Sequence, residues 1–300
     1  MNWILVSLFS LIPNPLDYDR RVTSDIQLGD FNFYILGLKG SFRGDSLVNQ
    51  LREIGADPII IWGVDGREIV FELTPNQEMK SLFLYGRNLI STEHACMAGH
   101  RKMHEVAHRK NDRISVFFED DAEILDVQHL INILNEIKNC SKKRGFWNLS
   151  SPDHNLLNPF LPILSNRFIA RTYLLPTLAT AYVVKADGLH EMEKLYKKFG
   201  FLGYLADVPP YYGDRLKFYS VVKPVLRGDG VNSIIGHRLT YNPADSNTIK
   251  SLLKNLSVFS GISWFLKGSR TTGIRGYLLL FHGRKIDHLR SKVESTKRRT

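Results

Sequence analysis

Two kinds of apolar pattern alternate along the first two thirds of the chain, and this alternation constrains the fold more than any other feature. Short runs rich in aromatic and β-branched residues, at 31–38, 57–64 and 113–118, are typical of buried strands. The stretch between the first two, at 45–54, carries its apolar residues at helical spacing and ends at a glycine. Strands that alternate with helices predict an α/β fold with a mainly parallel central sheet.

The same alternation continues to about residue 199. The further elements it predicts are a helix from the Ser91-Thr92-Glu93 cap to about Lys110, a helix at 127–137, strands at 146–149 and 179–184, and a helix at 189–199. In such folds, ligands bind beyond the carboxyl ends of the parallel strands. Asp65 follows the second strand and Glu119 follows the third, so we expect both at the same edge of the sheet.

Three acidic residues, Glu119, Asp120 and Asp121, directly follow the strand at 113–118. On an extended chain, side chains two residues apart project to the same side, so we expect Glu119 and Asp121 to face one point and Asp120 to face away. Crowded carboxylates repel one another unless a cation lies between them. Mg²⁺ and Mn²⁺ prefer carboxylate oxygens and also bind phosphates. The cluster therefore predicts a divalent metal site, and a solvated acidic turn is the alternative interpretation.

The composition is that of a packed protein without a cysteine framework. The 300 residues are 43% hydrophobic and 23% charged, which is ordinary for a globular chain. The two cysteines, Cys96 and Cys140, are too few for a disulfide framework or a four-cysteine zinc site. They favour a reducing compartment, although one bridge between them is also compatible with the sequence.

Nearly all of the formal net charge of +10 lies at the C-terminal end. Residues 251–300 hold eleven lysines and arginines against two acidic residues, a balance of +9. Aromatic and aliphatic residues are mixed with these cations, which suits an anionic membrane surface. A terminal helix packed on the domain, with a basic tail, is the alternative. Because the excess charge is confined to one end, we expect no nucleic-acid partner.

The sequence favours a cytoplasmic protein, peripheral at most to the inner face of the membrane. No run reaches the ~18 apolar residues that a spanning helix needs. Residues 3–13 are apolar, but no cationic start precedes them and no small-residue cleavage pattern follows. We interpret them as an early strand or a packed N-terminal arm, and a secretory signal is the disfavoured alternative.

Three histidines, His100, His104 and His108, fall on one face of the helix predicted from Ser91. Two such histidines can chelate zinc. The segment lacks the His-Glu-x-x-His pattern, however, and His108 lies among arginine and lysine residues. We therefore interpret this face as a solvated basic surface.

Several of these segments resemble glycosyltransferase family 25, which includes bacterial lipopolysaccharide galactosyltransferases and collagen galactosyltransferases. The resemblance covers roughly residues 31–238. The matching segments are Ile35-Leu36-Gly37-Leu38-Lys39 with Arg43, Gly63-Val64-Asp65-Gly66, Glu93-His94-Ala95-Cys96-Met97-Ala98-Gly99-His100, Glu119-Asp120-Asp121-Ala122, Ala181-Tyr182-Val183-Val184, and Asp207. Ala95 stands where the family has glycine, Gly99 stands where it has serine, and the family's Asn-Leu opening is altered.

The resemblance implies a GT-A-type fold, a nucleotide-binding α/β sandwich. The catalytic domain would then span 31–240, preceded by an N-terminal arm at 1–30 and followed by a basic, partly apolar appendage at 241–300. Its donor would be a UDP-sugar, with galactose favoured. Its acceptor would be a glycan, oligosaccharide or lipid-linked, of lipopolysaccharide or cell-surface polysaccharide assembly.

The resemblance also assigns roles to individual residues. The predicted ligands of Mn²⁺ or Mg²⁺ are Glu119, Asp121 and His237. The predicted donor-binding residues are Lys39 and Arg43 near the diphosphate, Asp65 near the uridine or ribose, and His100, which matches a family position. Surface-loop roles for Lys39, Arg43 and His237, and a turn role for Asp65 beside Gly66, stay open.

Transfer in such an enzyme would be inverting, with a carboxylate taking the proton from the acceptor hydroxyl. Asp207 and Asp153 are the candidates for that base, and both also suit turns. A metal-dependent phosphohydrolase or nuclease would use clustered carboxylates as well. An inactive, transferase-like protein that binds membranes is a third interpretation.

Overall fold

The computed structural model describes residues 28–85, 87–150, 168–171, 179–206, 212, 215–221 and 223–228. The predicted appendage and most of the predicted arm lie outside this part of the chain, as do Asp153, Asp207 and His237. Within the described residues, no helix combines the length and the apolar character that crossing a bilayer requires.

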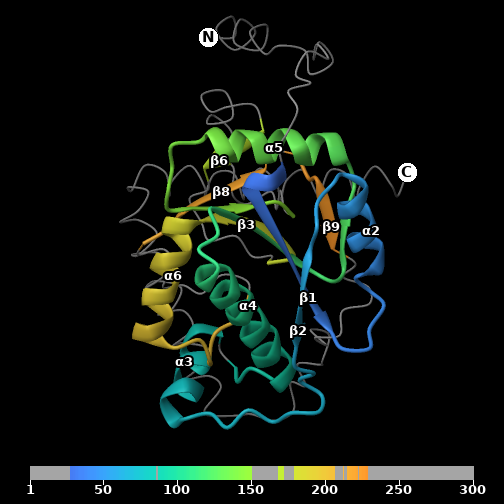
Figure 1. Cartoon of the computed structure of the whole chain (residues 1–300). Coiled ribbons are helices and arrows are strands. Elements are labelled where there is room, and N and C mark those ends of the chain that lie inside the picture. The colour runs from blue at the N-terminus through green and yellow to red at the C-terminus, as the bar shows by residue number, and fades with distance from the viewer. Residues whose placement is uncertain are drawn as a thin grey trace, which may run out of the picture.

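The described residues form a seven-stranded sheet with the order β2-β1-β3-β7-β5-β8-β6 and a two-stranded sheet of β4 and β9 (Figure 1). The strands are β1 (Phe31–Leu38), β2 (Ile59–Gly63), β3 (Ile114–Glu119), β4 (Ala122–Ile124), β5 (Gly145–Asn148), β6 (Ile169–Arg171), β7 (Ala181–Lys185), β8 (Lys217–Val221) and β9 (Leu226–Gly228). The helices are the short η1 (Leu28–Asp30), α2 (Asp45–Glu53), α3 (Pro75–Tyr85), α4 (Ser91–Arg109), α5 (Val127–Asn139) and α6 (Ala186–Phe199).

The seven-stranded sheet is mixed but mainly parallel. Strands β1, β2, β3, β5 and β8 run in one direction, whereas β6 and β7 run in the other. The α/β class and the mainly parallel sheet are therefore confirmed. The reversed strand β7 lies between β3 and β5 and is antiparallel to both.

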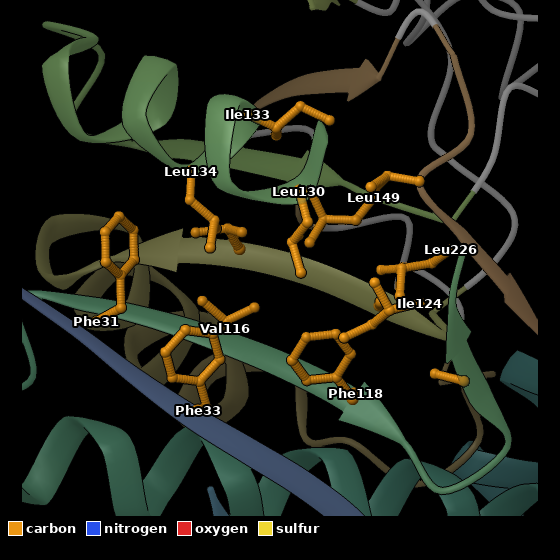
Figure 2. Packing of buried hydrophobic residues seen from close by; sticks show 14 of the residues in the cluster. Phe31, Phe33, Val116, Phe118, Ile124, Leu130, Ile133, Leu134, Leu149 and Leu226 are labelled. Atoms are coloured by element: carbon orange, nitrogen blue, oxygen red, sulfur yellow. The ribbon is translucent and has the colours of Figure 1, made fainter. Parts of the chain in front are cut away.

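Helices cover both faces of the large sheet. Because successive side chains of a strand point to opposite faces, each strand contributes residues to both of the cores beneath these helices. Phe33 and Phe118 pack against α2 and α5, whereas Tyr34 and Phe117 belong to the core shared with α4 and α6. Figure 2 shows the first of these cores, with Phe33 and Phe118 directed toward α5, which carries Leu130 and Leu134. A sheet buried on both faces explains why its strands read as continuous apolar runs.

The small sheet holds the chain in place just after the acidic residues. Strand β4 begins at Ala122, which pairs with Gly228 of β9. The backbone N–H of Leu125 also donates to the carbonyl of Val225 at 3.0 Å. The segment after β3 is therefore fixed by residues about a hundred positions later.

Most predicted boundaries fall within two residues of the observed ones, and the start of α4 differs in its cap. Ile90, not a residue of the Ser91-Thr92-Glu93 group, is the N-cap. The Glu93 carboxylate accepts the Ile90 backbone N–H at 3.0 Å, so it still satisfies a donor at the helix start. The sequence patterns did not predict the weakly apolar helix α3 or the short strands β4, β6, β8 and β9.

Candidate functional site

Three parallel strands end close together, and the loops that follow them carry most of the predicted site residues. In the sheet register, Leu36 of β1 lies beside Glu119, and Leu38 lies beside Gly63 at the end of β2. Asp65, two residues beyond β2, and Glu119 thus lie at the same edge of the sheet, as the strand pattern predicts.

The chain turns immediately after β3, and this turn brings two carboxylates to one arginine. Arg43, in the loop between β1 and α2, places Nη2 3.2 Å from Asp121 Oδ2 and 3.6 Å from Asp120 Oδ1. Glu119 instead contacts His100 of α4. The expectation that Asp120 faces away from the other carboxylates is therefore wrong, because Asp120 and Asp121 share the Arg43 guanidinium. The two-residue alternation of an extended chain stops where the chain turns, at Asp120.

Burial and repulsion from neighbouring carboxylates disfavour the ionised forms of Asp120 and Asp121. Burial, followed by the charge of Glu119, raises the pKa of Asp121 to about 6, although the Arg43 guanidinium opposes the shift. Burial likewise raises the pKa of Asp120 against the same guanidinium. Among the described residues, buried Asp121 Oδ1 has no hydrogen-bond partner. An orphaned, buried carboxylate oxygen beside a second carboxylate fits a hard divalent cation, so the donor set suits Mn²⁺ or Mg²⁺.

Glu119 is held from the side of α4. Its Oε1 accepts from His100 Nε2 at 3.0 Å and from the Cys96 thiol at 3.5 Å. Burial works against ionisation of Glu119, but the hydrogen bonds from His100 and Cys96 outweigh it, with a contribution from Arg43. The pKa of Glu119 is therefore below its usual value. Cys96 was not singled out from the sequence, although its spacing of four from His100 places both on one helix face.

The interpretation of the histidine face as a solvated basic surface is wrong for His100 and His104. Their side chains are buried, with 1% and 3% of their surfaces exposed. His100 Nδ1 lies 2.8 Å from the Tyr182 hydroxyl, which lies 2.6 Å from His104 Nε2. His104 Nδ1 lies 2.8 Å from the Tyr196 hydroxyl. Tyr182 on β7 and Tyr196 on α6 thus supply the hydrogen bonds that these two imidazoles need when they are buried.

The chain of hydrogen bonds continues from Tyr196 to the hydroxyl of Tyr212. Burial, with the neighbouring charge of Arg101, lowers the pKa of His104 well below its usual value, so its ring is neutral. Burial raises the pKa of Tyr182 well above its usual value, so its hydroxyl keeps its proton. His108, at the surface end of the same face, stacks on His190 instead.

The remaining predicted residues are less closely tied to the turn. Asp65 accepts from the Arg67 side chain and from its backbone N–H at 2.9 Å, and these bonds lower the pKa of Asp65 to about 2. This is the turn role that the sequence also allowed, and a part in nucleotide binding stays a prediction. Lys39 is exposed in the loop after β1. A β-carbon at Gly66 would lie 2.5 Å from Thr92 Cα, so glycine lets this loop pack onto the start of α4.

Comparison with known proteins finds distant structural likenesses and no match among family models or curated sequences. A glycosyltransferase involved in the glycosylation of the major capsid of PBCV-1 is similar over 56% of this chain and 65% of its own, with 8% identity and a TM-score of 0.30. The protein A197 from STIV is similar over 65% of this chain and 82% of its own, with 11% identity and a TM-score of 0.33. The chain thus spans less than two thirds of the first of these structures, and scores this low do not establish a shared function.

Proposed function

We propose that this protein is a metal-dependent glycosyltransferase that moves a sugar from a nucleotide-sugar donor to a glycan acceptor. The observation that carries the proposal is the pair Asp120 and Asp121 at the carboxyl edge of the sheet, with Arg43 against both and with Asp121 Oδ1 orphaned. A cation held by carboxylates and a guanidinium that binds phosphate oxygens would both stabilise the negative charge of a nucleoside diphosphate leaving group.

Each side chain at this edge has a distinct part in the proposal. Asp120 and Asp121 would hold Mn²⁺ or Mg²⁺, which would neutralise the charge that builds on the diphosphate as the sugar departs. Arg43 binds the diphosphate from the opposite side, and its planar guanidinium suits a pair of phosphate oxygens. Glu119 is the centre of the neighbouring contacts with Cys96 and His100, and it contributes negative charge to the site.

The finer features of the proposal rest on the family resemblance. They are a UDP-sugar donor with galactose favoured, inverting transfer with Asp207 or Asp153 as the base, and His237 as a further metal ligand. An acceptor of lipopolysaccharide or surface-polysaccharide assembly would place the protein at the cytoplasmic face of the membrane.

The proposal is tested by incubating the full chain with a panel of UDP-sugars and Mn²⁺ and measuring UDP release with and without glycan acceptors. We expect metal-dependent turnover of at least one donor, and we expect Asp121→Asn to abolish it. Glu123→Gln, two positions along on β4, is the matched control and should keep full turnover. Turnover of every donor at the background rate, or full activity of Asp121→Asn, would overturn the proposal. Acceptor-free cleavage of phosphate esters would identify a phosphohydrolase instead.

A further inference from the structure

We infer that Cys96, His100 and Glu119 form a separate metal site, one for zinc rather than for Mn²⁺ or Mg²⁺. One ligand atom from each residue, Sγ, a ring nitrogen and a carboxylate oxygen, lies within 4.8 Å of the other two. Glu119 Oε1 lies 3.0 Å from His100 Nε2 and 3.5 Å from Cys96 Sγ. These separations leave the three donors converging on one point.

The fold brings the three ligands together through a close helix–strand contact. Cys96 and His100 are one turn apart on α4, so they share a face. Between them, Gly99 lies against Leu36 of β1, where a β-carbon would come within 2.7 Å of the leucine side chain. Leu36 is the register partner of Glu119. The absence of a side chain at residue 99 therefore lets α4 approach the end of β3 closely enough for its two ligands to reach Glu119.

The donor set selects the ion. Zinc is bound well by thiolate, imidazole and carboxylate together, whereas Mg²⁺ and Mn²⁺ favour oxygen ligands. Three protein ligands leave a fourth position for water or another oxygen, as in zinc sites that act on a bound molecule. The Glu119 side chain is 21% exposed, so the cluster can be reached from solvent. Asp120 and Asp121 lie on the Arg43 side of the turn and are not part of this donor set.

The buried hydrogen-bond chain behind His100 orients the ring for an ion. Metal-bound histidines usually use the second ring nitrogen in a fixed hydrogen bond, and here His100 Nδ1 has the Tyr182 hydroxyl at 2.8 Å. Without an ion, His100 Nε2–H and the Cys96 thiol both donate to Glu119 Oε1. Nδ1 then accepts from Tyr182, and Tyr182 accepts from His104 Nε2–H.

A divalent ion takes the place of the two protons that point at Glu119. Coordination at Nε2 requires the other tautomer of His100, in which Nδ1–H donates to Tyr182. Tyr182 then donates to His104 Nε2, and His104 Nδ1–H donates to Tyr196. The hydrogen bonds reverse direction with no change in the number of protons they hold. The thiol proton of Cys96 is released to solvent, so one proton leaves for each ion bound.

The inference does not depend on the proposed transferase activity, because it is tested with metal alone. Titration of the metal-free full chain with Co²⁺, a coloured substitute for Zn²⁺, should give a near-ultraviolet thiolate-to-cobalt band that saturates at one ion per chain. Zn²⁺ should abolish the band. Cys96→Ser should remove the band and weaken Zn²⁺ binding by at least about a hundredfold, since outer-shell changes alone cost about 10–100-fold. Tyr182→Phe should weaken Zn²⁺ binding by that outer-shell factor.

Three control variants separate this site from other sites in the chain. Cys140→Ser changes the other cysteine, His108→Gln changes another histidine of α4, and Asp121→Asn changes the acidic turn. All three should keep the band. A band that survives in Cys96→Ser, no band at one equivalent in the wild-type protein, or loss of the band in Asp121→Asn would overturn the inference. Loss of transferase activity in Asp121→Asn with the cobalt band intact would support the two sites separately.

Discussion

Asp121→Asn should make the protein more stable at neutral pH, although it should abolish the proposed activity. The Asp121 side chain is 14% exposed, and its pKa rises on folding from 3.8 to about 6. The folded protein thus holds the proton more tightly than the unfolded chain does. The stability that this preference provides is complete below pH 3.8 and is lost as the pH rises through about 6. Asparagine, which stays neutral, has no such loss.

The size of the effect follows from the two pKa values. With both states ionised, the wild-type carboxylate costs the folded state about 3 kcal/mol. At about pH 4.5 the same two values give about 1 kcal/mol, because only the unfolded state is then largely ionised. The advantage of Asp121→Asn over wild type should therefore grow by about 2 kcal/mol between about pH 4.5 and pH 7.5. Any fixed effect of the amide on local geometry cancels in this difference.

Urea unfolding of both proteins at the two pH values, followed by far-ultraviolet circular dichroism, measures this growth. Glu123→Gln, whose side chain is 48% exposed, is the control, and its difference from wild type should change by less than about 0.5 kcal/mol. Mn²⁺ at about pH 7.5 should stabilise the wild type and not Asp121→Asn, because binding to the folded state alone raises apparent stability. A difference between Asp121→Asn and wild type that does not change with pH would refute the argument that Asp121 is destabilised by burial and repulsion.

Three further predictions concern the arginine, the buried histidine and the C-terminal end. Arg43→Ala should bind Mn²⁺ about tenfold more tightly, because a cation leaves the aspartates. The same change should lower turnover about a hundredfold. Arg43→Lys should lower turnover more than it raises the donor KM. Kinetic parameters within about twofold of wild type for both variants would show that Arg43 is a surface residue without a part in catalysis. His104→Ala should lower the free energy of unfolding by about 2 kcal/mol or more, since it leaves a cavity and two buried tyrosine hydroxyls each lose one hydrogen-bond partner. His108→Ala on the same helix should cost under about 0.5 kcal/mol, and equal losses in urea unfolding would contradict this prediction. Deletion of 283–300 should weaken binding to anionic liposomes at low salt, at about 1 kcal/mol for each cation that reaches the surface, and spare transfer to a soluble acceptor; unchanged sedimentation with liposomes at low and high salt would show that the segment only aids solubility.

The sequence predicted those features that local patterns determine. The strand at 31–38 and the helix that follows it were found because burial on both faces and helical spacing leave clear signals. The direction of β7 could not be found, since an apolar run looks the same in a parallel or an antiparallel strand. The placement of β7 depends instead on its pairing with β3 and β5.

The site was predicted in composition and less well in arrangement. Glu119 and Asp65 were placed at the correct edge because strand ends can be read from the chain. The burial of His100 and His104 was missed because their hydrogen-bond partners, Tyr182 and Tyr196, are 78 or more residues away in sequence. The sequence around a histidine buried between a helix and a sheet can look the same as the sequence around an exposed one. Only the distant hydrogen-bond partner shows whether the histidine is buried.

The pairing of Ala122 with Gly228 also has a consequence for synthesis of the chain on the ribosome. Strands β1 to β3 can assemble from the first 119 residues, but β4 has no strand partner until β9 emerges. Contacts between residues so far apart form late, because a long loop must close first. The acidic turn thus lacks this strand pairing until nearly the whole described fold exists, although the Gln50 side chain of α2 already hydrogen-bonds the backbone of Ile124. A nascent or truncated chain would present a folded sheet edge before Asp120 and Asp121 were fully held in place, and binding of Mn²⁺ or Mg²⁺ by these two carboxylates would be disfavoured until β9 had emerged.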